Sequence, residues 1–195
     1  YPGHIKDQTE SGRAELEKLR LTVREAVEEL REVGLQPEIV SGGSTPLLWL
    51  SHTVPELNEI RPGTYIFNDR NTVLSGACGK EDCAATVLAT VVSTAPGRII
   101  IDGGSKTFSS DRLSGSSEVT FGEVVGYPKL RFHKMNEEHG FIDLNGEEPV
   151  FGVGDRLRIV PNHICVAMNL HENVYGIRGD EVEHWWRVEG RGKLQ

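Results

Sequence analysis

Residues 38–46 have the sequence Glu-Ile-Val-Ser-Gly-Gly-Ser-Thr-Pro, and this stretch decides the fold class of the first part of the chain. Residues 38–40 predict a short buried strand, and the glycines after them predict a tight turn that leads into a short helix at residues 46–50. Before this stretch, apolar residues recur every three or four positions over residues 11–33, which indicates an amphipathic helix ended by Gly34. The order of helix, strand and glycine turn is typical of a parallel α/β fold.

Further along the chain, the predicted secondary structure changes from alternating helices and strands to strands alone. A second apolar piece, residues 64–67, completes an α/β segment that extends to about residue 75. After it, short strand-like runs alternate with Gly, Pro, Asn and Ser. These runs are residues 84–94, 98–102, 123–127, 130–133, 140–144, 156–160, 164–170 and 173–177. The sequence therefore predicts an α/β segment over residues 1–75 and a β-rich domain over residues 76–195.

Composition narrows the classes of partner. The chain of 195 residues is 37% hydrophobic and 26% charged, with a formal net charge of −8. An acidic chain without a basic stripe argues against nucleic-acid binding, and no apolar run approaches the roughly 20 residues that a membrane helix needs. Three cysteines and the lack of a signal-peptide pattern predict a cytoplasmic protein in which Cys78 and Cys83 are reduced thiols. Because the sequence starts at Tyr1 and not at an initiator Met, we expect that an N-terminal part of the protein precedes this sequence.

Pro161-Asn162-His163-Ile164-Cys165 is the strongest local signal for a metal site. If the chain stays extended, side chains two positions apart point to the same face, so that His163 and Cys165 can reach one ion. Imidazole and thiolate suit zinc, and a site with two protein ligands leaves positions for water or substrate, as in catalytic sites. The alternative is a half-buried histidine on a strand beside an inert cysteine.

The segment Ser41-Gly42-Gly43-Ser44-Thr45 is a candidate phosphate cradle. Glycines let the backbone approach an anion closely, and hydroxyl and backbone N–H groups can donate to phosphate oxygens. The G-x-G-x-x-G spacing and the lysine of a Walker loop are both missing. A glycine-rich turn that caps a helix is the alternative explanation.

Three further segments leave two explanations open. In Glu137-Glu138-His139, the imidazole of His139 beside two carboxylates could act as a base or contact a substrate, or the segment could be a solvated hairpin end. Residues 103–117, which include Lys106, could be an active-site loop or a polar surface loop. His184-Trp185-Trp186 indicates a packed strand or an interface rather than a cofactor site.

Six motifs in order along the chain resemble the D-threonine aldolase and D-serine dehydratase family. They are Tyr1-x-Gly3-His4, Ser41-Gly42-Gly43-Ser44-Thr45-Pro46, Arg61-Pro62-Gly63-Thr64-Tyr65-x-Phe67-x-Asp69, Asp102-x-Gly104-x-Lys106, Glu138-His139-Gly140 and Pro161-x-His163-x-Cys165. This family resembles fold-type III pyridoxal-phosphate enzymes such as alanine racemase. The resemblance implies that residues 1–75 are the last part of a TIM-like (β/α)8 barrel that binds pyridoxal phosphate. Residues 76–195 would then form a mostly antiparallel β domain with the metal site.

The resemblance also assigns residues to the site. It implies that the cofactor phosphate is bound by Gly42, Gly43, Ser44 and Thr45, that Tyr1 and Tyr65 line the cofactor pocket, that His163 and Cys165 bind the metal, and that His139 lies near the substrate. The thiolate of Cys165 favours zinc, with manganese as the alternative metal. A homodimer is implied as well.

The function implied is that of a lyase that depends on pyridoxal phosphate and a metal and acts on 3-hydroxy D-amino acids. It would be a D-threonine aldolase, which forms glycine and an aldehyde, or a D-serine dehydratase, which forms a keto acid and ammonia. The Schiff-base lysine of the family lies upstream of this chain, and Lys106 does not replace it, so the chain alone lacks part of the catalytic machinery. The alternatives are an amino-acid racemase of the same fold, a non-catalytic pyridoxal-phosphate-binding protein and a β-rich interaction module.

Overall fold

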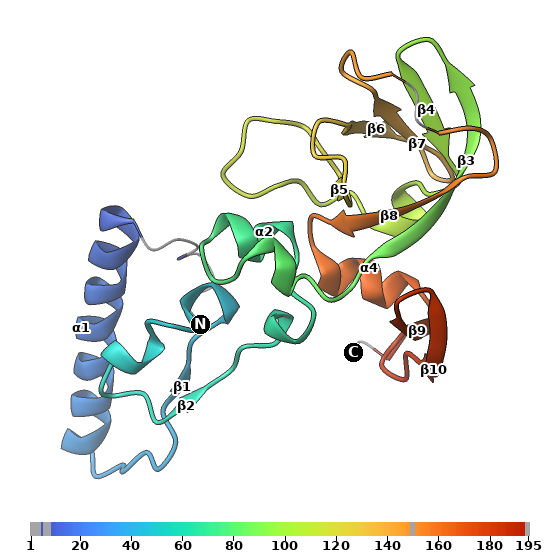
Figure 1. The fold of residues 1–195 in the computed structure, drawn as a ribbon. Helices are drawn as coiled ribbons and strands as arrows, with labels where there is room; N and C mark the ends of the chain where they lie inside the picture. The colour runs from blue at the N-terminus through green and yellow to red at the C-terminus, as the bar shows by residue number, and fades with distance from the viewer. Residues whose placement is uncertain (1–4, 6–8, 149–150, 194–195) are drawn as a thin grey trace. The chain divides into compact units, whose positions relative to one another are not determined.

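A computed structural model describes residues 5, 9–148 and 151–193, which form two compact units (Figure 1). The first unit comprises residues 1–68 and 72–82, and the second comprises residues 69–71 and 83–195. The sequence placed a boundary between residues 75 and 76, whereas the compact units divide after residue 82. Of the predicted site residues, Tyr1 lies outside the described part. No helix in the described ranges is long and apolar enough to cross a membrane.

The first unit begins with helix α1 (Glu10–Glu32), as the three- and four-residue periodicity predicts. Thr9 caps its start by accepting the N–H of Gly12 through Oγ1 at 3.3 Å. Gly34 follows its end with a φ of +83°, a left-handed conformation that glycine adopts without steric cost. Leu16 of α1 belongs to a small buried apolar cluster, whose other members are Ile5, Leu47 and Val54.

The prediction of a strand at residues 38–40 is wrong, because the strand lies slightly later in the chain. The structure places β1 at Ser41–Gly42, paired in parallel with β2 (Glu59–Ile60). Residues 38–40 form no ladder because the side chain of Asn58 occupies their backbone groups: Oδ1 accepts the N–H of Val40, and Nδ2 donates to the carbonyl of Glu38. Ile39 is accordingly 66% exposed.

Short helices make up the rest of the first unit and its link to the second. Three-residue 3₁₀ turns replace the helix predicted at residues 46–50 and the apolar piece at residues 64–67. The elements are η1 (Thr45–Leu47), η2 (Ser51–Thr53), η3 (Thr64–Ile66), α2 (Arg70–Leu74) and η4 (Lys80–Asp82). Single 3₁₀ turns are common as connectors, where few residues separate one element from the next.

The second unit is built on a six-stranded sheet in which every pair is antiparallel. Its strands are β3 (Val87–Ala95), β4 (Arg98–Ile101), β5 (Gly122–Val124), β6 (Arg131–Met135), β7 (Gly140–Asp143) and β8 (Arg156–Pro161), in the order β5-β8-β3-β4-β7-β6. The two ends of this order approach one another, since Phe121 beside β5 donates its N–H to the carbonyl of Phe132 in β6 at 2.9 Å. The sheet therefore curls towards a barrel, and six of the predicted strands are confirmed.

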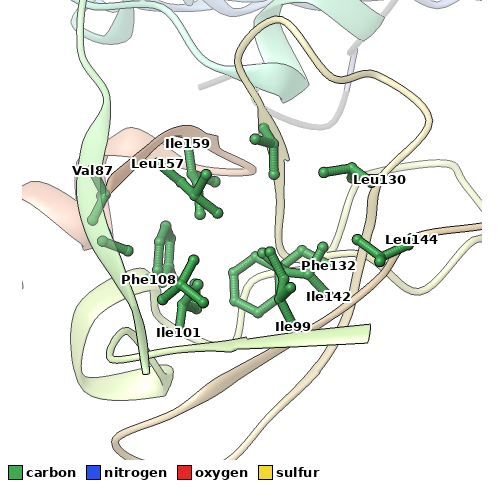
Figure 2. Packing of buried hydrophobic residues seen from close by; sticks show 13 residues of the cluster. Val87, Ile99, Ile101, Phe108, Leu130, Phe132, Ile142, Leu144, Leu157 and Ile159 are labelled. Atoms are coloured by element: carbon green, nitrogen blue, oxygen red, sulfur yellow. The ribbon is translucent and has the colours of Figure 1, made fainter. Parts of the chain in front are cut away.

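The inward face of this sheet forms the main hydrophobic core (Figure 2). Alternate residues of each strand point inwards, as the period of two requires. Phe132 lies at its centre, with its ring edge-on to Phe108 at 5.1 Å between centroids and to Phe121 at 5.9 Å. The aliphatic members from the strands include Val87, Ile99, Ile101, Ile142, Leu157 and Ile159.

Three elements complete the second unit. A short helix, α3 (Ser105–Phe108), lies within the loop of residues 103–117. Residues 164–170, predicted as a strand, form helix α4 instead. The hairpin of β9 (Asn173–Arg178) and β10 (Glu181–Arg187) follows, and it includes one strand that was predicted and one that was indicated only by its aromatic residues. All seven residues of β10 are exposed, so its tryptophans are on a strand as expected but are not buried.

Candidate functional site

His163 and Cys165 lie at the junction between strand β8 and helix α4. His163 has an extended backbone, with φ −136° and ψ 109°, and is the N-cap of α4 (Ile164–Leu170), whereas Cys165 is inside the first turn of that helix. The expectation that both residues lie on one face of an extended strand is therefore wrong. The strand-to-helix turn nevertheless brings the two side chains together, because the imidazole and the thiol form a hydrogen bond.

Asp69 joins this pair from a segment 94 residues earlier in the chain. Its side chain is fully buried, and Oδ2 lies 3.0 Å from Nδ1 of His163. The same oxygen accepts the backbone N–H of Ile164 at 3.0 Å. Because the first N–H groups of a helix have no partner within it, this carboxylate satisfies one of them and favours the helical conformation after His163. A contact distant in sequence thus explains why residues 164–170 form a helix.

The hydrogen bond from Asp69 is the main cause of a large shift in His163. Together with the hydrogen bond to Cys165, it raises the pKa of His163 to about 10, and partial burial opposes the shift. Without a metal, the ring is therefore protonated and paired with a buried carboxylate. A metal ion at this ring would have to replace one ring proton, since only an unprotonated nitrogen coordinates.

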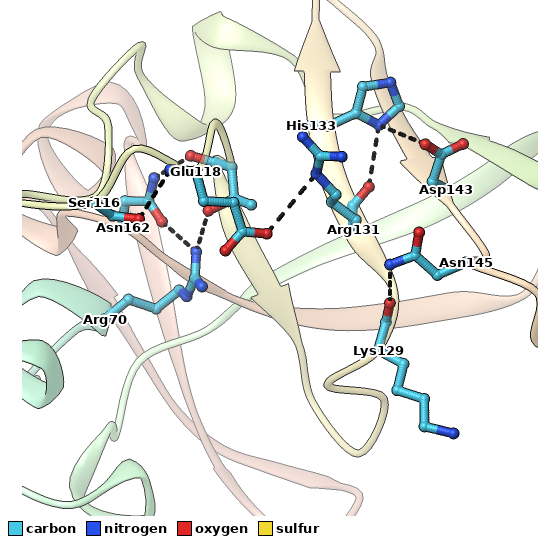
Figure 3. Close-up of polar contacts among 10 residues, drawn as sticks. Arg70, Ser116, Glu118, Lys129, Arg131, His133, Asp143, Asn145 and Asn162 are labelled. Carbon is cyan, nitrogen blue, oxygen red and sulfur yellow. Dashed lines mark hydrogen bonds and ion pairs between the residues drawn. The ribbon is translucent and has the colours of Figure 1, made fainter.

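Asn162, which precedes the pair, is buried and held on all sides. Its Oδ1 accepts from Nη1 of Arg70 at 2.8 Å (Figure 3). Its backbone carbonyl accepts the N–H of Asn71 at 3.2 Å. Its amide nitrogen donates to the carbonyls of Asp111, at 3.0 Å, and Thr120. With donors and acceptors satisfied, Asn162 fixes the backbone directly before His163.

Arg70 also lines a polar cavity of about 340 Å³ in the second unit. Its Nη1 donates to Oγ1 of Thr120 at 2.6 Å, and its Nε lies 3.8 Å from Glu123. Burial lowers the pKa of Arg70. The other charged residues of the lining are Glu118, Lys129 and Arg131, of which Glu118 and Arg131 face one another at 3.8 Å (Figure 3). Since the lining carries both positive and negative side chains, its charge does not favour one class of ligand.

The predicted phosphate cradle lies in the first unit and has buried, unsatisfied hydroxyl groups. Oγ of Ser41 and Oγ of Ser44 are buried and have no hydrogen-bond partner in the part of the chain that is described. Gly43 between them has a φ of +74°, and a Cβ there would lie 2.8 Å from Oγ of Ser51. Thr45 accepts the backbone N–H of Tyr65 through Oγ1 at 3.2 Å. Unsatisfied buried hydroxyls call for a partner, and an anion would supply acceptors for both.

Tyr65 lies on η3 and is 49% exposed. Its backbone contact with Thr45 places it next to the glycine turn, as the resemblance implies for a residue of the same pocket. Its phenol therefore remains accessible to a ligand at the surface of this unit.

His139 lies in the turn between β6 and β7, next in sequence to the two glutamates that contact Lys106. His139 is exposed, and its backbone N–H donates to Oδ1 of Asn136 at 2.8 Å. Lys106 on α3 lies 2.6 Å from a carboxylate oxygen of Glu138 and 3.0 Å from one of Glu137. The hydrogen bonds to these carboxylates raise the pKa of Lys106, so its amine stays protonated and is not a nucleophile.

The structure thus brings together His163, Cys165 and one residue to which the sequence assigned no role. In the sequence, Asp69 was only the last residue of a motif, Asn162 lay inside another motif without a role, and Arg70 belonged to none. A polar residue directly after an apolar piece is a weak hint, and only the fold shows that it is buried. Across residues 5, 9–148 and 151–193, no three His, Cys, Asp or Glu side chains form a ready-made metal cage.

The chain is similar to known proteins over most of its length. The model of the serine dehydratase domain family matches residues 84–177. The 3-hydroxy-D-aspartate aldolase of Paracoccus denitrificans is 33% identical over 203 residues, which cover 99% of this chain and 50% of that protein. The D-threo-3-hydroxyaspartate dehydratase of Delftia sp. is 32% identical over 200 residues, which cover 94% of this chain and 53% of the dehydratase.

The fold of this chain is also similar to that of solved structures. D-threonine aldolase from Filomicrobium marinum matches with a TM-score of 0.83 and 25% identity, over 98% of this chain and 52% of that one. The Delftia dehydratase matches with a TM-score of 0.79 and 30% identity, over 96% of this chain and 52% of that one. A D-threo-3-hydroxyaspartate dehydratase has also been solved as a histidine-to-alanine variant and as a cysteine-to-alanine variant in a metal-free form.

This chain spans about half the length of the relatives it matches. The likeness covers both the α/β unit and the antiparallel β unit, so the predicted fold class is confirmed. About a third of the residues are identical to those of an aldolase and of a dehydratase, over almost the whole chain. The chain therefore belongs to the D-threonine aldolase and D-serine dehydratase family.

Proposed function

We propose that the protein is a lyase that acts on 3-hydroxy D-amino acids with pyridoxal phosphate and a divalent metal ion. The observation that carries this proposal is the cluster of His163, Cys165 and the buried Asp69. Two protein ligands leave room in the metal coordination shell for a substrate hydroxyl, which is what an aldolase or dehydratase of a 3-hydroxy amino acid must bind.

The donor set fits a metal ion. When Nδ1 of His163 donates to an ionised carboxylate, Nε2 is left as the ring nitrogen that can coordinate. The thiolate of Cys165 favours zinc over the harder manganese. In the solved D-threo-3-hydroxyaspartate dehydratase variants, the replaced histidine and cysteine are two positions apart, as His163 and Cys165 are, and the structure of the cysteine variant is a metal-free form. This match supports the assignment of the pair as metal ligands.

The glycine turn fits the phosphate of the cofactor. The buried hydroxyls of Ser41 and Ser44 would donate to its oxygens, and Gly42 and Gly43 keep the backbone open to it. Thr45 and Tyr65 lie beside them on adjoining turns. When bound, pyridoxal phosphate supplies an electron sink for the bond broken at Cα of the substrate.

The side chains of this protein would decide which bond breaks. A group that removes the proton from the substrate's 3-hydroxyl favours cleavage between Cα and Cβ, with glycine and an aldehyde as products. A group that removes the Cα proton favours loss of the hydroxyl, with a keto acid and ammonia as products. His139 is the proposed residue near the substrate, because it is exposed on a turn that Lys106 holds through two carboxylates. Lys106 itself is engaged in those ion pairs.

The test uses the full-length protein with pyridoxal phosphate and zinc, incubated with D-threonine, D-serine and the D-isomers of 3-hydroxyaspartate. Aldolase activity releases acetaldehyde from D-threonine, and dehydratase activity releases pyruvate from D-serine. We expect one of these product classes, abolished by a chelator and by His163→Ala or Cys165→Ala. Lys129→Met, at a surface ion pair, serves as the control that keeps activity.

Two outcomes would contradict the proposal. Conversion of a D-amino acid into its L-isomer, with no aldehyde or keto acid formed, would indicate a racemase. Unchanged lyase activity in His163→Ala would show that the metal pair plays no part. We propose a homodimer as well, which sedimentation of the full-length protein would test.

A further inference from the structure

The segment Asp69–Asn71 is set into the second unit although its neighbours in sequence on both sides belong to the first. All three residues make contacts there. Asp69 reaches His163 and Ile164, Arg70 reaches Thr120 and Asn162, and Asn71 accepts the N–H of Ser114 at 2.7 Å.

The segment also contacts each of the three residues that form the strand-to-helix junction, residues 162–164. Asn71 donates its backbone N–H to the carbonyl of Asn162, and Arg70 donates to the side chain of Asn162. Asp69 contacts the next two residues, His163 through the ring and Ile164 through the backbone. The junction is therefore held at three consecutive positions by three consecutive residues.

We propose that Asp69–Asn71 is the positioning element of the metal pair, with Asp69 setting the tautomer and the ring orientation of His163. An ionised carboxylate can only accept a hydrogen bond, so a 3.0 Å contact with Nδ1 keeps the ring proton on that atom. Nε2 is then the metal-binding nitrogen. Complete burial of Asp69 removes competing water and limits the ring to one orientation.

The same oxygen that contacts the imidazole also accepts the N–H of Ile164, which comes directly before Cys165. One buried atom thereby fixes the ring of the first ligand and the start of the helix that carries the second. Arg70 and Asn162 add a second brace on the other side of His163. The spacing between imidazole and thiolate is set by these contacts rather than by the extended chain that the sequence suggested.

This inference rests on the proposed metal site, and the test separates the two. Zinc dissociation constants are measured by competition with a chromophoric chelator for the full-length wild-type protein and for Asp69→Asn, His163→Ala and Asp155→Asn. Asp155→Asn is the matched control, since Asp155 accepts a backbone N–H through Oδ2 at 2.8 Å in a turn away from the junction. Unfolding temperatures without metal are recorded in parallel.

We expect Asp69→Asn to weaken zinc binding about 10- to 100-fold, because an outer partner of a metal-binding histidine has that effect. Asp155→Asn should bind as the wild type does, and His163→Ala should lose more affinity than Asp69→Asn. With saturating cobalt, Asp69→Asn should keep the thiolate-to-metal charge-transfer band, which assigns the loss to the imidazole. A purely structural role for Asp69 would lower the unfolding temperature and leave the dissociation constant unchanged.

The outcomes are distinct. Wild-type affinity in Asp69→Asn, together with a loss in His163→Ala, would overturn the positioning role and leave the metal site intact. Equal affinity in the wild type and His163→Ala would instead overturn the metal site. If Asp69→Asn does not fold, nitrogen-15 spectra of the zinc-bound wild type decide the matter: a proton on Nδ1 of His163 supports the proposal, and a proton on Nε2 refutes it.

Discussion

At the scale of single residues, Lys106 shows how an exposed group is fixed by its surroundings. Its amine contacts two consecutive glutamates, although its side chain is 59% exposed. The hydrogen bond from Lys106 is the main reason why the pKa of Glu138 is below its usual value. A carboxylate with a lowered pKa loses its ion pair only when the pH falls through that lowered value.

Replacement of Lys106 should therefore change the titration of Glu138. We expect Lys106→Met to raise the pKa of Glu138 towards that of an ordinary glutamate, because the hydrogen bond and the attraction between the charges are both lost. Carbon-13 NMR titration of the side-chain carboxyl groups measures this directly. Lys129→Met, which removes a similar pair with Glu147, is the control and should leave Glu138 unchanged. An unshifted Glu138 in Lys106→Met would show that the contact is not maintained in solution.

Gly43 allows a second test at this scale. Gly43→Ala places a Cβ 2.8 Å from Oγ of Ser51 and forces a non-glycine residue to a φ of +74°. The conformation alone costs about 1–2 kcal/mol. We expect a loss of stability in urea and weaker binding of pyridoxal phosphate, followed by absorbance titration.

The control for this change is Gly97→Ala. Gly97 has a φ of +77°, and a Cβ there meets nothing within 4 Å. Gly97→Ala should therefore lose similar backbone energy and retain cofactor binding. Equal affinity for pyridoxal phosphate in the two variants would argue against the role of the glycine turn.

At the scale of elements, the six-stranded sheet depends on the packing of its inward face. Phe132 on β6 contacts two other aromatic rings and is fully buried, whereas Phe141 on the neighbouring strand β7 is half-buried on the other face, 5.2 Å from the amine of Lys134. The two residues therefore differ in packing but not in chemistry.

This pair gives a matched prediction. Phe132→Ala should lower the free energy of unfolding by about 3–5 kcal/mol, because it removes a large buried side chain and leaves a cavity. Phe141→Ala should cost clearly less, since water already reaches that ring. Urea unfolding followed by circular dichroism measures both. Equal losses would mean that the inward face is not the main core.

At the scale of the whole molecule, the proposed metal site links binding to stability. An ion that binds only the folded protein stabilises it by about 2.7 kcal/mol when its free concentration is one hundred times the dissociation constant. We expect zinc to raise the unfolding temperature of the wild-type protein in a concentration-dependent way, and a chelator to reverse the effect. Calorimetry with and without zinc measures the shift.

The shift should disappear in His163→Ala and persist in His133→Ala. His133 is a suitable control because it is also a partly exposed histidine near an aspartate, with Nδ1 3.6 Å from Asp143. A zinc-dependent shift that survives in His163→Ala would place the ion elsewhere.

The sequence by itself determined the features that depend on local pattern. Periodicity over residues 11–33 gave α1, and the alternation of apolar residues gave the strands of the antiparallel sheet. The glycine at position 34 predicted the end of α1, and the structure confirms it with a left-handed backbone at Gly34. Each of these depends on residues a few positions apart, so the pattern is visible without the fold.

The tertiary structure decided what depends on distant contacts. The apolar run at residues 164–170 is too short to separate strand from helix, and the carboxylate of Asp69 favours the helix by accepting the N–H of Ile164. The order of residues could show that His163 and Cys165 are neighbours, but not that their side chains meet across a strand-to-helix turn. Nor could it show that a buried carboxylate 94 residues away holds the ring, because burial and hydrogen bonding between distant segments arise only when the chain has folded.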